Sequence, residues 1–250
     1  MKVAVCIKRV PDSEARIRIA PDGKAIDPAG INFDISPYDE YAIEEALKLQ
    51  SAQPGSEVCV FCAGPAEAAT QIRRALAMGA DRGVLLKGDF PFGDAAAVAA
   101  PLAGALKAFG PDLVLFGKQA IDDDALQVPA FVAQALGIPL VSVVTKLEVK
   151  EGRALAHRQI EGGHEVVEVA LPAALSCQKG LNVPRFASLP NIMKAKKKPL
   201  EEVVAAPGPL RAVLVSLAPP PARKAGRIVG QGPDAVPALL KALHDEAKVI

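Results

Sequence analysis

Short apolar runs alternate with amphipathic stretches along the first 145 residues of the chain. The runs "KVAVCI" (2–7), "EVCVFC" (57–62) and "DLVLF" (112–116) are typical of strands buried on both faces. Between them, segments 36–49 and 65–78 carry apolar residues at helical spacing. Strands that alternate with helices predict βαβ units, and therefore a doubly wound, mostly parallel α/β sheet of the Rossmann-like type.

The pattern changes in the second part of the chain. Residues 154–175 form two strand-like halves about Gly162–Gly163, which predicts a β-hairpin. Segment 182–202 contains three prolines and has no lasting period, which favours an extended arm. We therefore predict one α/β domain over residues 1–181, hairpin included, and a C-terminal arm and tail over 182–250. An arm of this length usually needs a partner to cover it.

Composition narrows the class of protein. The chain has 250 residues, half of them apolar, and a formal net charge of +1, which argues against nucleic acid as a partner. No apolar run reaches the roughly 18 residues that a membrane span requires, so no membrane insertion is expected. The N-terminus passes directly into a strand-like run, which predicts no signal peptide. The expected location is the bacterial cytoplasm.

Two of the four cysteines, Cys59 and Cys62, have the spacing of a metal or redox pair. They fall inside a predicted buried strand, however, where residues three apart point to opposite faces. We therefore predict packing cysteines and no metal site.

The common catalytic and phosphate-binding motifs are missing. The sequence contains no G-x-x-x-x-G-K-[ST] loop, no G-x-G-x-x-G after the first strand, no nucleophile elbow and no H-E-x-x-H. This disfavours an enzyme with its own catalytic constellation. A crevice at the carboxyl ends of the parallel strands is still expected, because ligands of doubly wound sheets bind there.

Three adjacent aspartates lie in one of the segments expected to line that crevice, "GKQAIDDDALQV" (117–128). They could begin and cap a helix, or could hold Mg²⁺ together with a phosphate. If a phosphate binds here, backbone N–H groups near 125–128 and the amide of Gln127 are better donors than the carboxylates. The residues alone leave these alternatives open.

Four segments resemble the β subunit of electron transfer flavoprotein: "ALAMGADRG" (75–83), "DLVLFGKQAIDDD" (112–124), "RQIEGGHEVVEVALPAALS" (158–176) and "PRFASLPNIMKAKKK" (184–198). Their order and spacing extend the similarity over nearly the whole chain. The resemblance implies a heterodimer in which an α subunit carries FAD and this chain buries a structural AMP. Electrons would come from acyl-CoA and related dehydrogenases and pass to a membrane quinone oxidoreductase, with no substrate turnover by this chain.

The resemblance also implies an AMP site. Its residues here would be Cys6, Ser36, Pro37, Tyr38, Asp39, Ala63, Gly117, Lys118, Gln119, Ala120, Ile121, Asp122, Asp123, Asp124, Ala125, Leu126, Gln127 and Val128. Tyr38 is the expected flavin-facing aromatic. Two positions depart from the family pattern: Val128 replaces a small hydroxyl residue, and Ser13 replaces a second aromatic. Backbone N–H groups would then have to bind the phosphate.

Segment 184–198 corresponds to the recognition loop of that family, which docks dehydrogenases through a leucine. The implied docking residues are Leu189, Pro190, Ile192, Met193, Lys194 and Lys197. An exposed apolar anchor suits docking, and the lysines at 194 and 196–198 would steer an acidic partner. The wider arm and tail would wrap the α subunit. Two alternatives stay open: a second FAD in place of AMP, as in electron-bifurcating relatives, or an ATP-using α/β enzyme.

Overall fold

The computed structural model describes residues 1–222 and 225–250. The chain divides into two units, Met1–Leu217 and Ala218–Ile250. The first contains the sheet and every residue that the sequence places in a site.

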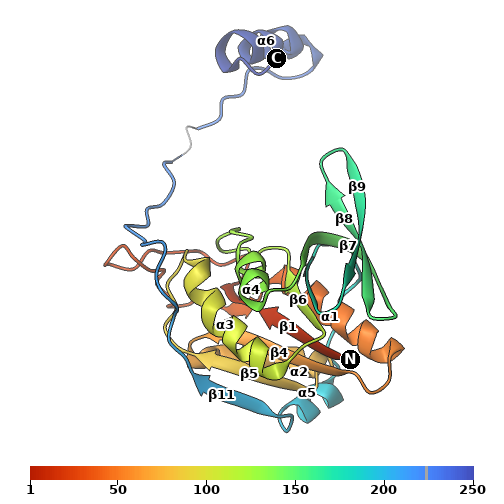
Figure 1. Ribbon diagram of the computed structural model, residues 1–250. Helices are drawn as coiled ribbons and strands as arrows, with labels where there is room; N and C mark the ends of the chain where they lie inside the picture. The colour runs from red at the N-terminus through yellow and green to blue at the C-terminus, as the bar shows by residue number, and fades with distance from the viewer. Residues whose placement is uncertain (223–224) are drawn as a thin grey trace. The chain divides into compact units, whose positions relative to one another are not determined.

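A nine-stranded sheet forms the centre of the first unit, in the order β11-β5-β4-β1-β6-β10-β7-β8-β9 (Figure 1). Neighbouring strands from β11 to β7 are parallel, while β8 and β9 continue the sheet in antiparallel pairing. The strands are β1 (Lys2–Ile7), β4 (Glu57–Gly64), β5 (Arg82–Lys87), β6 (Leu113–Gly117), β7 (Leu140–Lys150), β8 (Arg153–Ile160), β9 (Gly163–Ala170), β10 (Ala173–Cys177) and β11 (Leu200–Val204). A separate small sheet pairs β2 (Arg9–Pro11) with β3 (Phe33–Ile35).

Helices cover both faces of the large sheet. Helices α1 (Pro37–Ala52) and α2 (Ala69–Met78) pack on one face, α2 being preceded by a 3₁₀ turn, η1 (Ala66–Ala68). Helices α3 (Ala95–Phe109) and α4 (Val128–Leu136) pack on the other. Every residue of β6 and β10 is buried, because these strands have a helical layer on each side. The predicted doubly wound α/β fold is confirmed.

The predicted hairpin is present as β8 and β9, joined at Glu161–Gly162, and it projects from the edge of the sheet (Figure 1). The last residues of the stretch 154–175 are not part of this hairpin. Residues 173–177 leave the hairpin and form β10, which inserts between β6 and β7. The sequence prediction of a hairpin over the whole of 154–175 was therefore too long, since the inserted strand shares the apolar pattern of its neighbours.

The prediction of an extended arm over 182–202 was wrong from residue 189 onward, because that part contains regular structure. Helix α5 spans Leu189–Ala195, and β11 adds a parallel edge strand beside β5. The Ser188 side chain accepts a hydrogen bond from the N–H of Asn191, and Pro190 lies in the first turn, where its missing N–H is harmless. Seven residues are too few to show a helical period.

All four cysteines are buried and free. Cys59 packs beneath α3 and α4, and Cys62 packs beneath α1 and α2, so the two thiols occupy opposite faces of β4, as predicted. Burial raises the pKa of both thiols to about 12. Neither is poised to form a thiolate near neutral pH.

The second unit is small and helical. It contains a 3₁₀ turn, η2 (Pro233–Ala235), then α6 (Val236–Lys241) and a π-helical turn, η3 (Ala242–Ala247). Among its described residues none is fully buried, and apolar side chains such as Leu239, Leu240 and Ile250 are exposed. A unit of this kind has no apolar core of its own.

Candidate nucleotide-binding crevice

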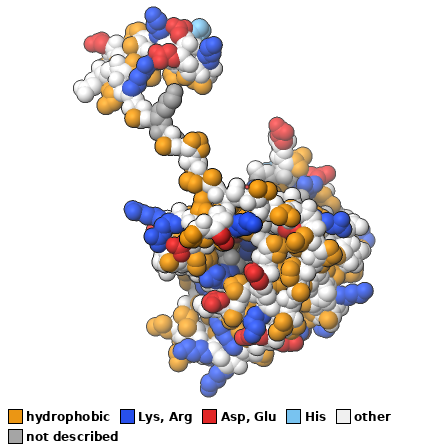
Figure 2. Space-filling view, turned by 90° about the vertical axis from the view of Figure 1, so that its left-hand side faces the viewer, with side chains coloured by type: hydrophobic (Ala, Val, Ile, Leu, Met, Phe, Trp, Pro, Cys, Tyr) orange, Lys and Arg blue, Asp and Glu red, His pale blue; other side chains and the backbone are white. Residues whose placement is uncertain are grey.

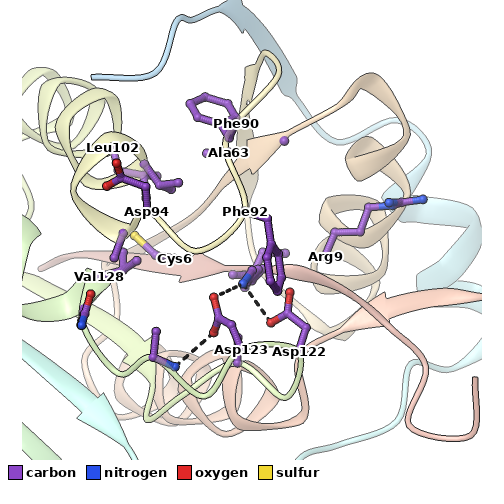
Figure 3. A pocket seen from close by; sticks show the side chains of 18 of the residues that line it. Cys6, Arg9, Ala63, Phe90, Phe92, Asp94, Leu102, Asp122, Asp123 and Val128 are labelled. Carbon is purple, nitrogen blue, oxygen red and sulfur yellow. Dashed lines mark hydrogen bonds and ion pairs between the residues drawn. The ribbon is translucent and has the colours of Figure 1, made fainter. Parts of the chain in front are cut away.

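A cavity of about 640 Å³ lies at the carboxyl ends of β1, β4 and β6 (Figure 3). The turn between β6 and α4 forms one wall, and the loop 88–94 between β5 and α3 forms the facing wall. This is the edge at which doubly wound sheets bind ligands. Its volume falls in the range of small-molecule sites.

Most residues implied for the AMP site line this cavity. They are Cys6, Asp39, Ala63, Gly117, Lys118, Gln119, Ala120, Asp122, Asp123, Ala125, Leu126, Gln127 and Val128. Five others do not line it, namely Ser36, Pro37, Tyr38, Ile121 and Asp124. Ser36 precedes α1 without a side-chain capping bond, contrary to the capping role that its position suggests, and its hydroxyl donates to the carbonyl of Gln119 instead.

Two of the three aspartates are paired with a lysine that sequence reasoning missed. Lys8 Nζ lies 2.8 Å from Asp122 Oδ1 and 2.8 Å from Asp123 Oδ2. Burial alone would lower the pKa of Lys8, but the two carboxylates outweigh it and raise that pKa. The ring of Phe92 lies beside the ammonium, with its centre 5.8 Å from Lys8 Nζ (Figure 3). The pairing offsets one of the two negative charges that would otherwise oppose a phosphate here.

Of the alternatives left open for these aspartates, the helix start does not agree with the structure. Helix α4 begins at Val128, just before Pro129, and has no acidic residue in its first turn. The aspartates instead shape the preceding turn. Asp123 accepts a hydrogen bond from the N–H of Ala125, and Asp124 accepts one from the Gln119 amide at 2.6 Å. These two hydrogen bonds stabilise the conformation of the turn.

Backbone N–H groups in this turn form a cradle suited to an anion. Leu126 has a left-handed φ of 56°, and Gln127 follows with φ −95° and ψ −33°. Adjacent left- and right-handed residues turn successive N–H groups to one side, making an anion-binding concavity. Within the described parts of the chain, no group accepts a hydrogen bond from the N–H of Leu126, Gln127 or Val128. Three donors at the N-terminus of α4 are thus free for a phosphate.

Asp39 ties two strand ends together. Its Oδ2 accepts a hydrogen bond from the N–H of Lys8 at 2.7 Å, and its Oδ1 accepts one from the N–H of Gly117 at 3.0 Å. The side chain is buried in the first turn of α1. Asp39 therefore fixes the spacing of the β1 and β6 ends, which sets the shape of the cavity floor.

Replacing Asp39 with asparagine is expected to flatten the pH dependence of stability between about pH 4 and pH 7. Burial, opposed by the two N–H donors, raises the pKa of Asp39 from 3.8 to about 7. In this window the folded chain keeps a proton that the unfolded chain releases. The wild-type free energy of unfolding should therefore fall as pH rises, by at most about 1.4 kcal/mol per pH unit from this group. Asparagine cannot titrate.

Urea unfolding of both proteins across this window measures the difference. Above about pH 8 the two curves should run parallel, because Asp39 is then ionised in both the folded and unfolded states. Parallel curves over the whole range would contradict the assignment.

The loop 88–94 was missed by sequence reasoning. Its sequence, "GDFPFGD", places Phe90, Phe92 and Asp94 at the cavity. The available signal was a Gly- and Pro-rich turn after a strand, which is common to many loops. Asp94 caps α3 through the N–H of Ala97 and also accepts hydrogen bonds from the N–H groups of Arg211 and Ala212.

Tyr38 lies outside the cavity, beside Lys118, whose Nζ is 5.8 Å from the centre of the Tyr38 ring. Val128 does line the cavity but offers no side-chain donor. The residues that the family resemblance implies for docking form a group elsewhere. Leu189, Ile192, Met193, Lys194 and Lys197 are exposed on and beside α5. At the level of α5, the lowest helix in Figure 1, Figure 2 shows basic and hydrophobic side chains together.

The sequence matches known proteins over most of its length. Residues 24–207 match the family model described as electron transfer flavoprotein domain. The chain is 43% identical over 234 residues to an electron transfer flavoprotein subunit beta of Syntrophomonas wolfei, covering 94% of this chain and 92% of that protein. A Bradyrhizobium diazoefficiens protein of the same name is 40% identical over 254 residues, with 100% of both chains covered.

A third relative has a different name. The caffeyl-CoA reductase–Etf complex subunit CarD of Acetobacterium woodii is 41% identical over 203 residues, covering 80% of this chain and 77% of that protein. In the described part of the structure, no helix has the length and apolar character needed to cross a membrane.

Proposed function

The chain belongs to the electron transfer flavoprotein β-subunit family, and we propose from this premise that its crevice binds AMP. An α subunit would complete a heterodimer and hold most of the FAD. The chain itself would turn over no substrate. The large sheet and its crevice would bind the nucleotide, and the tail beyond β11 would wrap the α subunit, because β11 is itself a strand of that sheet.

The observation that supports AMP most directly is the N–H cradle at Leu126, Gln127 and Val128. It offers three backbone donors to one phosphate, at the N-terminus of a nine-residue helix. Lys8 offsets part of the charge of the neighbouring aspartates. A single phosphate needs no glycine-rich pyrophosphate loop, which agrees with the lack of such motifs. Val128 requires that the backbone, and no hydroxyl side chain, make these bonds.

Docking and the route of the electrons complete the proposal. Dehydrogenases, acyl-CoA dehydrogenases among them, would dock at the exposed apolar and basic side chains of α5 and reduce the flavin. Tyr38 would face the flavin ring from this subunit, with the Lys118 ammonium beside it. The reduced heterodimer would then pass electrons to a membrane quinone oxidoreductase.

A second candidate places another FAD in the crevice in place of AMP. The similarity to CarD, a subunit named for a reductase–Etf complex, favours testing it. The adenosine monophosphate part of FAD would occupy the same N–H cradle, so the cradle does not separate the two ligands. The identity of the bound nucleotide does.

The experiment is to co-express the chain with an electron transfer flavoprotein α subunit and to analyse the nucleotides that the denatured complex releases. We expect one FAD and one AMP per heterodimer and a yellow complex that an acyl-CoA dehydrogenase reduces. Two FAD molecules would establish the second candidate. A colourless complex that accepts no electrons would overturn both, and ATP turnover by the isolated chain would indicate an enzyme instead.

A further inference from the structure

The segment 186–194 combines extreme exposure with firm attachment at both ends. Phe186 is 95% exposed and Leu189 is 79% exposed, which is unusual for large apolar side chains in a folded unit. An exposed loop with such residues usually has a mobile backbone. Here the residues on either side of the segment are tied to two different helices.

The first attachment joins Arg185 to α1. Its guanidinium donates two hydrogen bonds to the Glu44 carboxylate, at 2.8 Å and 2.9 Å, and its backbone N–H donates a third at 3.2 Å. Glu44 is only 6% exposed. Bidentate bonds between charged groups are the strongest hydrogen bonds available to side chains, and a buried acceptor shields them from water. Asn182 adds bonds to Glu45 and to the carbonyl of Tyr41.

The second attachment joins the end of the segment to the C-terminus of α2. Lys198 Nζ donates to the carbonyls of Leu76, Gly79 and Ala80, at 3.0, 3.0 and 2.6 Å. These carbonyls lie where a helix leaves acceptors unpaired and carries partial negative charge. The prediction that Lys198 belongs with the steering lysines was therefore wrong, because its ammonium is engaged inside the fold.

Arg73 of α2 strengthens this second attachment. Its guanidinium donates to the carbonyls of Ala195 and Lys198, at 2.8 Å and 2.6 Å. Ala195, the last residue of α5, is buried. The helix is thus fixed at its C-terminus, while its first turn stays exposed.

We propose that Arg185, through Glu44, and Lys198, through the α2 carbonyls, are positioning residues that hold 186–194 in its docking conformation before a dehydrogenase arrives. The proposal rests on the docking role stated under Proposed function. A segment ordered in advance loses little conformational entropy on binding, so more of the contact energy appears as affinity. Phe186, which follows Arg185 in the chain and is also exposed, would supply a second apolar contact.

A merely structural role predicts something different. If the attachments only joined the arm to the domain, breaking one would alter stability and leave docking unchanged. Positioning instead predicts that amide protection in α5 and docking affinity fall together, while the turnover of the docked complex is preserved. Both quantities can be measured on the complete heterodimer.

The test compares Arg185→Gln and Lys198→Met with Lys196→Met. Lys196 is exposed, and its ammonium makes no ion pair or hydrogen bond with the described residues, so this control removes a charge close to the segment without touching either attachment. Reduction of each heterodimer by an acyl-CoA dehydrogenase gives KM and kcat. Hydrogen exchange reports the backbone amides of 189–195.

We expect each attachment variant to raise KM about tenfold with kcat unchanged, and to speed exchange in α5 by a similar factor. Arg185→Lys keeps the charge but cannot form the bidentate pair of hydrogen bonds, so both effects should be smaller than in Arg185→Gln. Lys196→Met should leave exchange unchanged and raise KM less than about threefold, an effect that disappears at high salt.

Two results would overturn the proposal. One is faster exchange with unchanged KM, and the other is a raised KM with unchanged exchange. If Arg185→Gln does not fold, Lys198→Met still tests the proposal, because it breaks the second attachment, to the α2 carbonyls. Leu189→Ala distinguishes failure of the positioning role from failure of the docking role. If Leu189→Ala raises KM and the attachment variants do not, the positioning role is wrong and the docking role stands. If Leu189→Ala leaves KM unchanged, the docking role itself is wrong.

Discussion

Gly117→Ala is expected to empty the crevice and to lower the free energy of unfolding by about 2–3 kcal/mol. A methyl group at this position would lie 2.3 Å from Asp39 Oδ1 and 2.7 Å from both the Asp39 nitrogen and the Tyr38 carbonyl carbon. Two of these atoms are backbone atoms at the start of α1, so they cannot move aside as a flexible side chain would. The helix must shift, and the Asp39 bonds to β1 and β6 are then lost.

Urea unfolding measures the stability of this variant, and nucleotide analysis of the purified heterodimer measures what it retains. Gly104→Ala is the matched control, since a methyl group there meets no atom within 4 Å. Gly104 lies inside α3, where alanine should stabilise the helix by about 0.5–1 kcal/mol. Full nucleotide content and a wild-type free energy of unfolding in Gly117→Ala would contradict this prediction, and would show that α1 can shift without loss of stability.

Leu189→Ala should raise the KM of the dehydrogenase for the heterodimer about 30-fold, with little change in stability. An anchoring side chain buried at the centre of an interface contributes about 2 kcal/mol or more, and every 1.4 kcal/mol is a factor of ten. In the free chain Leu189 is 79% exposed, so truncating it removes few contacts within the fold. The unfolding free energy and the nucleotide content should stay near those of the wild type.

The control for this variant is Val166→Ala on the β8–β9 hairpin, which also trims an exposed apolar side chain. It should leave KM unchanged. Loss of stability or of nucleotide in Leu189→Ala would mean that the first turn of α5 packs inward in solution. That result would contradict the docking role given to it.

Local pattern was enough to predict the central architecture. Strands buried on both faces, such as β1 and β6, appear as continuous apolar runs, and α1 shows its apolar stripe at helical spacing. The opposite orientation of Cys59 and Cys62 also follows from the strand period alone. Such features depend on residues a few positions apart, which a single sequence displays directly.

The sequence was enough to predict where the site lies, but not which side chains contact one another there. The cavity edge follows from the topology rule for doubly wound sheets, and most implied residues line it. The partner of Asp122 and Asp123 did not follow, because Lys8 is 114 positions away from the first of them. Without that lysine the role of the aspartates stayed open between a helix start and a metal site. The facing loop 88–94 was missed because a Gly- and Pro-rich turn after a strand is common to many loops.

The sequence by itself determined most strands of the sheet, the main helices and the edge of the sheet where a ligand would bind, because each depends on local period and turn chemistry. Only the tertiary structure decided that β10 enters the middle of the sheet and that β11 joins its edge. It also decided that Asp39 braces two strand ends and that Arg185 and Lys198 hold the docking segment. These are contacts between residues far apart in the chain, and their energies depend on distance and burial, which the order of residues does not contain.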